Sequence, residues 1–213
     1  MWSILQKLWQ ELLQICSQSA GTQSRPRTTR PQFQRTRPQQ QGSQTQTQQT
    51  KPRTQEVWTK KQRIRLAVEN KILAAKAPGF HFYEHTRTDK TYVAGRVKTS
   101  DGHKYELKIL LGTKFPDKVP KMYVVSPHKV PKYGGGFVND AGLSHRFHTR
   151  GKGPEGCVEI CHCSSWDPSL NLLSVLVKGA VWCEAHCRHL KSGISIATVC
   201  DELKDQVPDL NNY

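Results

Sequence analysis

Apolar side chains recur at two different periods along this chain, and the change of period separates the elements it predicts. Residues 56–77 repeat apolar positions at helical spacing and predict one helix that ends before Pro78-Gly79. The apolar positions expected to face the core are Trp58, Ile64, Val68 and Ile72. Basic residues lie on the other face, so we expect an amphipathic helix at the start of a folded domain.

A period of two follows the helix and indicates strands with one buried face. Three strands are expected at residues 80–85, 92–98 and 104–111. The sequence Ser100-Asp101-Gly102 is typical of the turn of a β-hairpin. A fourth strand, residues 122–125, follows two prolines that enforce an extended connection. The pattern therefore predicts a helix followed by a four-stranded antiparallel meander.

Periodicity is lost at residues 127–156, which are rich in glycine and predict a long irregular loop. A loop of that length inside a compact domain is usually functional. Asp167 and Pro168 are typical of a helix start, and the following residues are apolar on nearly every face. We therefore expect a buried C-terminal helix, a short helix near residues 198–204, and an α+β fold.

The first 55 residues differ in kind from the rest of the chain. Residues 1–16 place apolar side chains at helical spacing and predict an amphipathic docking helix. Residues 17–55 are rich in Gln, Thr, Pro and Arg and predict a disordered basic linker. The folded domain is expected at residues 56–213. Because the polar face of the first helix is rich in Gln rather than Lys, we expect it to dock on a protein partner instead of a membrane surface. Docking back on its own domain is the third alternative.

Charge and cysteine content narrow the compartment and the partners. The net charge is +15, of which residues 1–55 contribute +7, so both parts favour acidic partners. Among such acidic partners, we do not favour nucleic acid. The seven cysteines are odd in number and clustered, and charged or amide residues interrupt the first apolar stretch. We therefore expect reduced thiols in a cytoplasmic protein with no transmembrane segment.

Three motifs, in order along the chain, resemble the ubiquitin-conjugating enzyme family. Residues 115–123 are similar to its aromatic-Pro-x-x-x-Pro segment before the fourth strand, residues 157–160 to its active-site cysteine, and residues 166–170 to its Trp-x-Pro step. The distance from Cys157 to Trp166 is one residue longer than in the family. Its His-Pro-Asn sequence is replaced by residues 144–148, which look more like the divergent bacterial relatives.

The resemblance implies a ubiquitin-conjugating-enzyme-like fold with an active-site loop, and an enzyme without a cofactor. Such an enzyme receives a ubiquitin-like modifier from an ATP-dependent activating enzyme as a thioester and transfers it to a lysine of a target protein. Cys157 is the expected nucleophile, since it follows a glycine and nearby cations favour its thiolate. These cations are Arg146, Arg150 and Lys152. His148 is expected to bind the oxyanion or orient the amine, with His145 as the alternative. Either histidine can instead cap a loop carbonyl.

The remaining cysteines favour a different class of function. Soft ligands suited to a structural zinc ion occur at Cys161, Cys163, Cys183 and Cys187. A protein holding zinc there is either still a conjugating enzyme or a catalytically silent module that binds protein or nucleic acid. Cys183 and Cys187 are one helical turn apart and fit a buried helix face equally well as small core side chains.

Overall fold

The computed structural model describes residues 57–204, and the expected docking helix and linker at residues 1–55 lie outside them. Within the described part the fold is α+β, as predicted, with three α-helices and one seven-stranded antiparallel sheet. The helices are α2 (Lys60–Lys76), α3 (Leu172–Ser192) and α4 (Ile196–Lys204). The strands are β1 (Phe80–Tyr83), β2 (Tyr92–Lys98), β3 (Lys104–Leu110), β4 (Lys121–Ser126), β5 (Leu143–Ser144), β6 (Thr149–Lys152) and β7 (Val158–Ile160).

Helix α2 begins with a capping box, in which Thr59 and Gln62 each accept a hydrogen bond from the other's backbone N–H. The predicted buried face is partly wrong, because Ile64 and Val68 are exposed. The side chains that α2 buries are Leu73 and, unexpectedly, the carboxylate of Glu69. Trp58 is buried, but it lies before the helix rather than on it.

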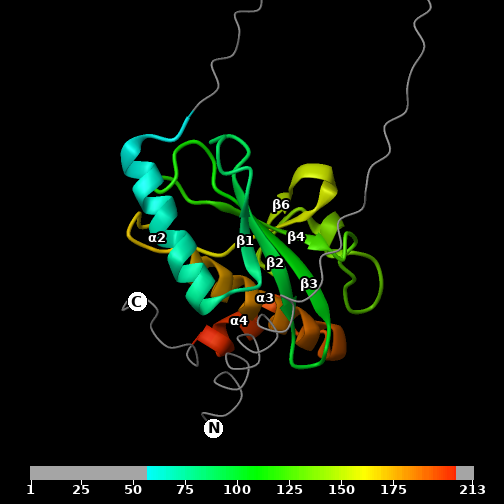
Figure 1. The fold of residues 1–213 in the computed structure, drawn as a ribbon. Coiled ribbons are helices and arrows are strands. Elements are labelled where there is room, and N and C mark those ends of the chain that lie inside the picture. The colour runs from blue at the N-terminus through cyan, green and yellow to red at the C-terminus, as the bar shows by residue number, and fades with distance from the viewer. Residues whose placement is uncertain (1–56, 205–213) are drawn as a thin grey trace, which may run out of the picture.

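Strands β1 to β4 form the predicted meander, each antiparallel to the next (Figure 1). In β3 the residues Tyr105, Leu107 and Ile109 are buried, in alternation with half-buried neighbours. This is the pattern of a sheet that has one face on the core. The four-strand prediction for this region is confirmed, with bounds that differ by one or two residues.

The region expected to be an irregular loop supplies two further strands, β5 and β6, and β7 follows directly after it, so the prediction of a four-stranded sheet is wrong in extent. The chain leaves β4, forms β5 and β6 at the far edge, and returns as β7 to pair with β4. The strand order is β1-β2-β3-β4-β7-β6-β5. The added strands are two to four residues long, too short to show a period in the sequence.

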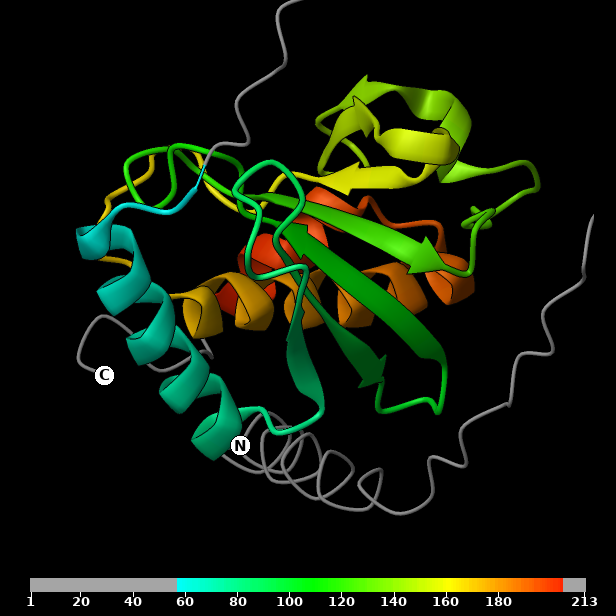
Figure 2. The same ribbon diagram turned by 45° about the horizontal axis from the view of Figure 1, so that its top comes forward.

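Helix α3 is the buried helix expected from the apolar run, and it crosses one face of the sheet (Figure 2). Its close approach depends on Gly179, where a Cβ atom would lie 2.7 Å from Met122 Sδ and 2.8 Å from a Leu107 methyl carbon. The expected start at Asp167-Pro168 is wrong. Asn171 caps α3, and Asp167 instead forms a turn in which its carboxylate accepts from the Ser169 N–H at 2.7 Å.

Helix α4 confirms the short C-terminal helix and packs against α3. Its buried side chains include Ile196, Val199 and Leu203, which extend the core beyond the sheet. None of the helices in residues 57–204 is long and apolar enough to cross a membrane.

Candidate active site

Strand β7 carries a cysteine beyond each of its ends, Cys157 before Val158 and Cys161 after Ile160. Three residues lie between the two, and four residue steps of extended chain correspond to about 13 Å. The β6–β7 register pairs Thr149 with Ile160 and Lys152 with Val158. The turn that holds His145 and His148 therefore lies at the Cys161 end, and the structure does not bring either histidine to Cys157.

Cys157 lies in a closed environment. Its side chain is 5% exposed, its carbonyl accepts from the Gly153 N–H at 2.7 Å, and its own N–H donates to the Pro154 carbonyl. Burial raises the pKa of the Cys157 thiol, and the nearby Glu155 carboxylate raises it further, against a smaller opposing effect of Lys108. The thiolate is therefore disfavoured in the described conformation, opposite to the sequence expectation.

The three cations expected around Cys157 are engaged elsewhere. The Arg150 guanidinium donates to the Cys163 carbonyl at 2.7 Å, and Arg146 donates to the Gly193 carbonyl at 3.4 Å. Lys152 pairs with the Asp140 carboxylate at 3.7 Å. Sequence proximity was misleading because the chain reverses between β6 and Cys157, and each of the three cations has a partner other than the thiol.

Cys161 lies in a more open position, next to His148. Its side chain is half-buried, and its N–H donates to the His148 carbonyl at 2.9 Å. In return, His148 Nδ1 lies 2.6 Å from the Cys161 carbonyl oxygen, so Nδ1 is the donor and Nε2 keeps its lone pair. His148 holds a positive φ of 53°, an uncommon backbone geometry for a residue other than glycine. His148 thus caps a loop carbonyl, one of the two roles foreseen, and the Cys161 thiol donates to the Cys163 carbonyl oxygen, 3.8 Å from its sulfur.

The Cys161 loop is braced against the proline-containing segment before β4. His162 Nε2 donates to the Pro120 carbonyl at 2.8 Å, and Trp166 Nε1 donates to the Pro116 carbonyl at 2.7 Å. Burial lowers the pKa of His162, whose Nδ1 is enclosed without a hydrogen-bond partner. Two of the motifs that suggested the family are therefore in direct contact.

A charged pair on α2 fixes the segment that follows the loop. The Arg65 guanidinium donates to the Pro168 and Leu170 carbonyls and to the Glu69 carboxylate. The second carboxylate oxygen of Glu69 accepts the Leu172 N–H, the first turn of α3, at 2.8 Å. Burial raises the pKa of Glu69, although Leu172 and Arg65 both oppose the rise. Sequence analysis missed this pair, for which the i, i+4 spacing was the available signal.

The four cysteines expected to hold zinc do not assemble. Cys161 and Cys163 lie in the loop after β7, whereas Cys183 and Cys187 are buried on α3. Among residues 57–204, these four sulfurs do not form a cluster with ligand atoms within 4.8 Å of one another. The two helix cysteines behave instead as small core side chains, the alternative that the sequence left open.

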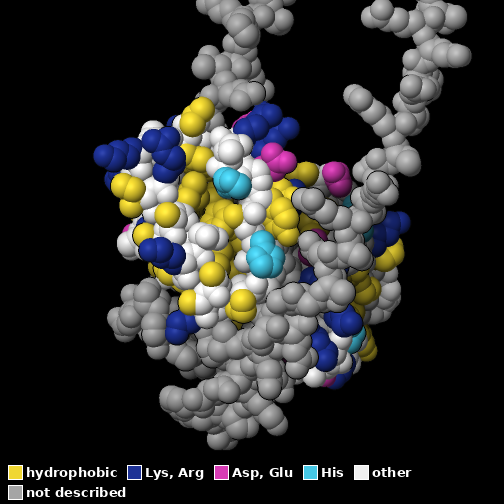
Figure 3. Space-filling model, in the orientation of Figure 1, with side chains coloured by type: hydrophobic (Ala, Val, Ile, Leu, Met, Phe, Trp, Pro, Cys, Tyr) yellow, Lys and Arg dark blue, Asp and Glu magenta, His cyan; other side chains and the backbone are white. Residues whose placement is uncertain are grey.

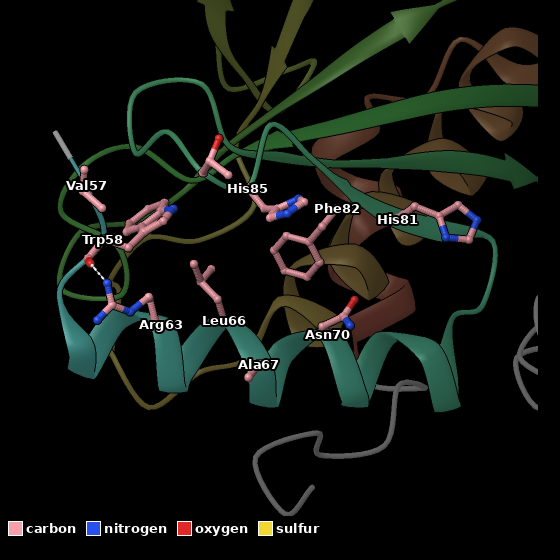
Figure 4. A pocket seen from close by; sticks show the side chains of 10 residues that line it. Val57, Trp58, Arg63, Leu66, Ala67, Asn70, His81, Phe82 and His85 are labelled. Carbon is pink, nitrogen blue, oxygen red and sulfur yellow. Dashed lines mark hydrogen bonds between the residues drawn. The ribbon is translucent and has the colours of Figure 1, made fainter. Parts of the chain in front are cut away.

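An apolar groove of about 670 Å³ lies between α2 and β1, apart from the cysteines. Trp58, Leu66 and Phe82 point into it, and Arg63 donates to the Trp58 carbonyl at its end (Figure 4). Hydrophobic side chains gather in this part of the surface (Figure 3). The residues lining the groove include no cysteine, so it offers no nucleophile.

No protein-family model, curated protein or solved structure matches this chain. The resemblance therefore rests on the motifs, and an inference of function must rest on the chemistry of the site. That chemistry consists of a half-buried thiol, a histidine hydrogen-bonded to the backbone of the same cysteine, and a loop braced by His162 and Trp166.

Proposed function

We propose that the chain is a cysteine-dependent conjugating enzyme with a ubiquitin-conjugating-enzyme-like fold, and that it carries a ubiquitin-like protein as a thioester. The observation that carries this proposal is the half-buried Cys161 on a braced loop, with His148 hydrogen-bonded to the Cys161 backbone. The order of helix, meander, cysteine loop, Trp166 and buried helix supports it. Cytoplasmic partners remain part of the proposal: the modifier, its ATP-dependent activating enzyme and a target protein.

The chemistry needs one sulfur that both accepts and releases an acyl group. The Cys161 thiol loses its proton, and the sulfur bonds to the carbonyl carbon of the modifier while the thiol of the activating enzyme leaves with a proton. A lysine amine then attacks the same carbon, loses a proton, and displaces the Cys161 thiolate. His148 Nε2 is the proton acceptor in either step, because Nδ1 is committed to the Cys161 carbonyl.

Cys161 replaces Cys157 in this proposal because the two thiols differ in access. A modifier's C-terminus must reach the sulfur, and the Cys157 side chain is 5% exposed with a raised thiol pKa. The Cys161 side chain is half-buried and lies at the end of β7 that holds both candidate histidines. Cys157 as nucleophile therefore stays the competing prediction, and the next experiment separates the two.

The test is a charging assay with a ubiquitin-like protein, its activating enzyme and Mg-ATP, on wild type and two serine variants. We expect Cys161→Ser to convert a thioester that reductant cleaves into an ester that resists it. Cys157→Ser is the matched control and is expected to charge as wild type does. A stable ester on Cys157→Ser instead would return the nucleophile to Cys157. Unchanged thioester formation by both variants would contradict a role for either cysteine.

His148 is tested in the same assay through the second step. We expect His148→Ala to slow transfer to free lysine by about a hundredfold, the usual effect of removing a general base. His145→Ala, in the same turn but exposed, is the matched control and is expected to stay within about twofold of wild type. Equal losses in the two variants would mean that the turn as a whole, and not the His148 imidazole, supports transfer.

A further inference from the structure

The turn between β2 and β3 is fastened to α3 at one end of the strands (Figure 1). The Glu184 carboxylate accepts from the Ser100 N–H at 2.6 Å and from the Ser100 hydroxyl at 2.8 Å. Lys191 Nζ lies 2.8 Å from the Asp101 carboxylate. Glu184 and Lys191 are two turns apart on α3, and Cys187 lies between them on the same face, since residues three and four apart are neighbours on a helix.

This arrangement brings together three side chains of metal-binding chemistry. The ligand atoms of Asp101, His103 and Cys187 all lie within 4.8 Å of one another. Among residues 57–204 they form the one such group. Asp101 and His103 are exposed, so they are accessible to an ion from solvent, and Cys187 forms the buried floor of the cluster. We propose that Asp101, His103 and Cys187 bind a zinc ion between the β2–β3 turn and α3.

The donor set selects the metal. One carboxylate oxygen, one imidazole nitrogen and one sulfur suit zinc, whereas magnesium and calcium prefer oxygen ligands alone. Three protein ligands leave the fourth tetrahedral position to water. The Cys187 thiol releases one proton to solvent when it binds the ion as a thiolate.

Neighbouring groups already orient the cysteine. The Cys187 Sγ lies 3.4 Å from the Tyr105 hydroxyl and donates to Thr99 Oγ1 at 3.4 Å. The Tyr105 hydroxyl also contacts His186 Nδ1 at 2.6 Å, which fixes the position of its oxygen. The Tyr105 proton is committed to His186 Nδ1, because His186 Nε2 donates to the Pro131 carbonyl at 2.7 Å. Once the thiolate forms, the Thr99 hydroxyl can turn from the His103 carbonyl and donate to the sulfur, and such an outer hydrogen bond strengthens metal binding.

Small movements complete the geometry. Ligand atoms around tetrahedral zinc are roughly 3.5 Å apart, given bonds of about 2.0 to 2.3 Å. The Asp101 and His103 side chains therefore need to close by about an ångström, which exposed side chains do by rotation. Lys191 competes for Asp101, but its side chain is 64% exposed and free to turn into solvent. The ion would thus replace a surface ion pair with a tighter link between turn and helix.

The proposed zinc site is independent of the conjugating activity, because the two sites lie at opposite ends of the sheet. The β2–β3 turn precedes β3, whereas Cys161 follows Ile160, which lies at the other end of β3, near Leu110. The test uses the reduced, metal-free 213-residue protein. Zinc affinity is measured by competition with a chromophoric chelator, and Co²⁺ is added separately to detect a thiolate-to-cobalt charge-transfer band. We expect one equivalent of either metal to bind, with the band present.

Variants at the two exposed ligands carry the test, because Cys187→Ser changes a buried position. We expect His103→Ala and Asp101→Asn each to lower zinc affinity by at least about tenfold. His81→Ala, which removes an exposed histidine from β1, is the matched control and is expected to leave affinity unchanged. Lys191→Ala is expected to raise affinity, because it removes the competitor for Asp101.

Three results would overturn the proposal. The first is the absence of zinc binding by the wild type at micromolar metal. The second is binding with no thiolate charge-transfer band for cobalt, which would exclude Cys187 as a ligand. The third is affinity that survives His103→Ala and is lost in Cys161→Ser, which would place the metal in the loop after β7.

Discussion

The two ends of β7 differ in what surrounds their cysteines, although they belong to one short strand. Before the strand, Cys157 is buried, its carbonyl is bound by the Gly153 N–H, on which the Tyr123 ring packs, and its thiol pKa is raised. After the strand, Cys161 is half-buried beside His148. The comparison teaches that a cysteine motif alone does not choose a nucleophile. Access and the neighbouring base do, and both depend on strand register.

The largest expected difference between the two cysteines is in their rates of alkylation. In a brief pulse on the native protein, Cys161 is expected to react at least about thirtyfold faster than Cys157, because a buried thiol reacts only after a local opening of about 2 kcal/mol. The measurement is peptide mapping by mass spectrometry over a time course. In denaturant the two rates are expected to converge, which serves as the control. Faster labelling of Cys157 in the native protein would reverse the assignment.

A substitution at Gly153 is expected to expose Cys157, at the start of β7. A Cβ atom there would lie 2.3 Å from two ring carbons of Tyr123, so Gly153→Ala forces the ring to move. Overpacking of this kind costs about 1 to 3 kcal/mol, measured by urea unfolding. We expect Cys157 alkylation to rise several-fold while Cys161 alkylation stays constant.

A second background controls for other effects of the new methyl group. In a Tyr123→Leu protein, Gly153→Ala is expected to cost much less, since the ring it meets is gone. An equal cost in both backgrounds would show that the clash with Tyr123 is not what closes the Cys157 end.

The large elements and their order could be predicted from the sequence, whereas the site could not. The meander and α3 have enough residues for their periods to appear, and the structure confirms both. Strands β5 to β7 are too short for that, and their pairing, which places His148 next to Cys161, is a long-range property. Glu69 was unpredictable for the same reason, because a carboxylate is buried only where a distant partner such as the Leu172 N–H meets it.

A smaller effect on stability is expected from the loop after β7, which Trp166 and His162 hold in place. Trp166→Phe keeps most of the ring but removes the hydrogen bond to the Pro116 carbonyl. We expect a loss of about 1 kcal/mol in the free energy of unfolding, and faster hydrogen exchange confined to the loop of residues 161–166. Tyr83→Phe, which removes a polar group from an exposed ring on β1, is the comparison variant. If exchange rose equally around Cys157, the two ends would not be independent.

The smallest expected effect is a pH dependence of the braced end, arising from His162. Burial lowers the pKa of its imidazole below the ordinary 6.5, so between that lowered value and 6.5 the unfolded chain binds more protons than the folded one. The contribution of the neutral His162 ring to the free energy of unfolding is therefore fully present above pH 6.5, and it is lost as the pH falls through the lowered pKa. The measurement is the free energy of unfolding between pH 7 and pH 4.

His162→Gln separates this contribution from others. Its amide can still donate to the Pro120 carbonyl but does not titrate, so we expect a flatter profile. His186, whose pKa burial lowers to about 4, acts in both proteins and cancels in the difference. Protection of the Cys161 amide is expected to fall with acid in wild type only, while the Gly153 amide at the other end of β7 keeps its protection. Identical profiles for wild type and variant would mean that the loop is held by Trp166 alone, and that the neutral His162 ring adds nothing to the contrast between the two cysteines.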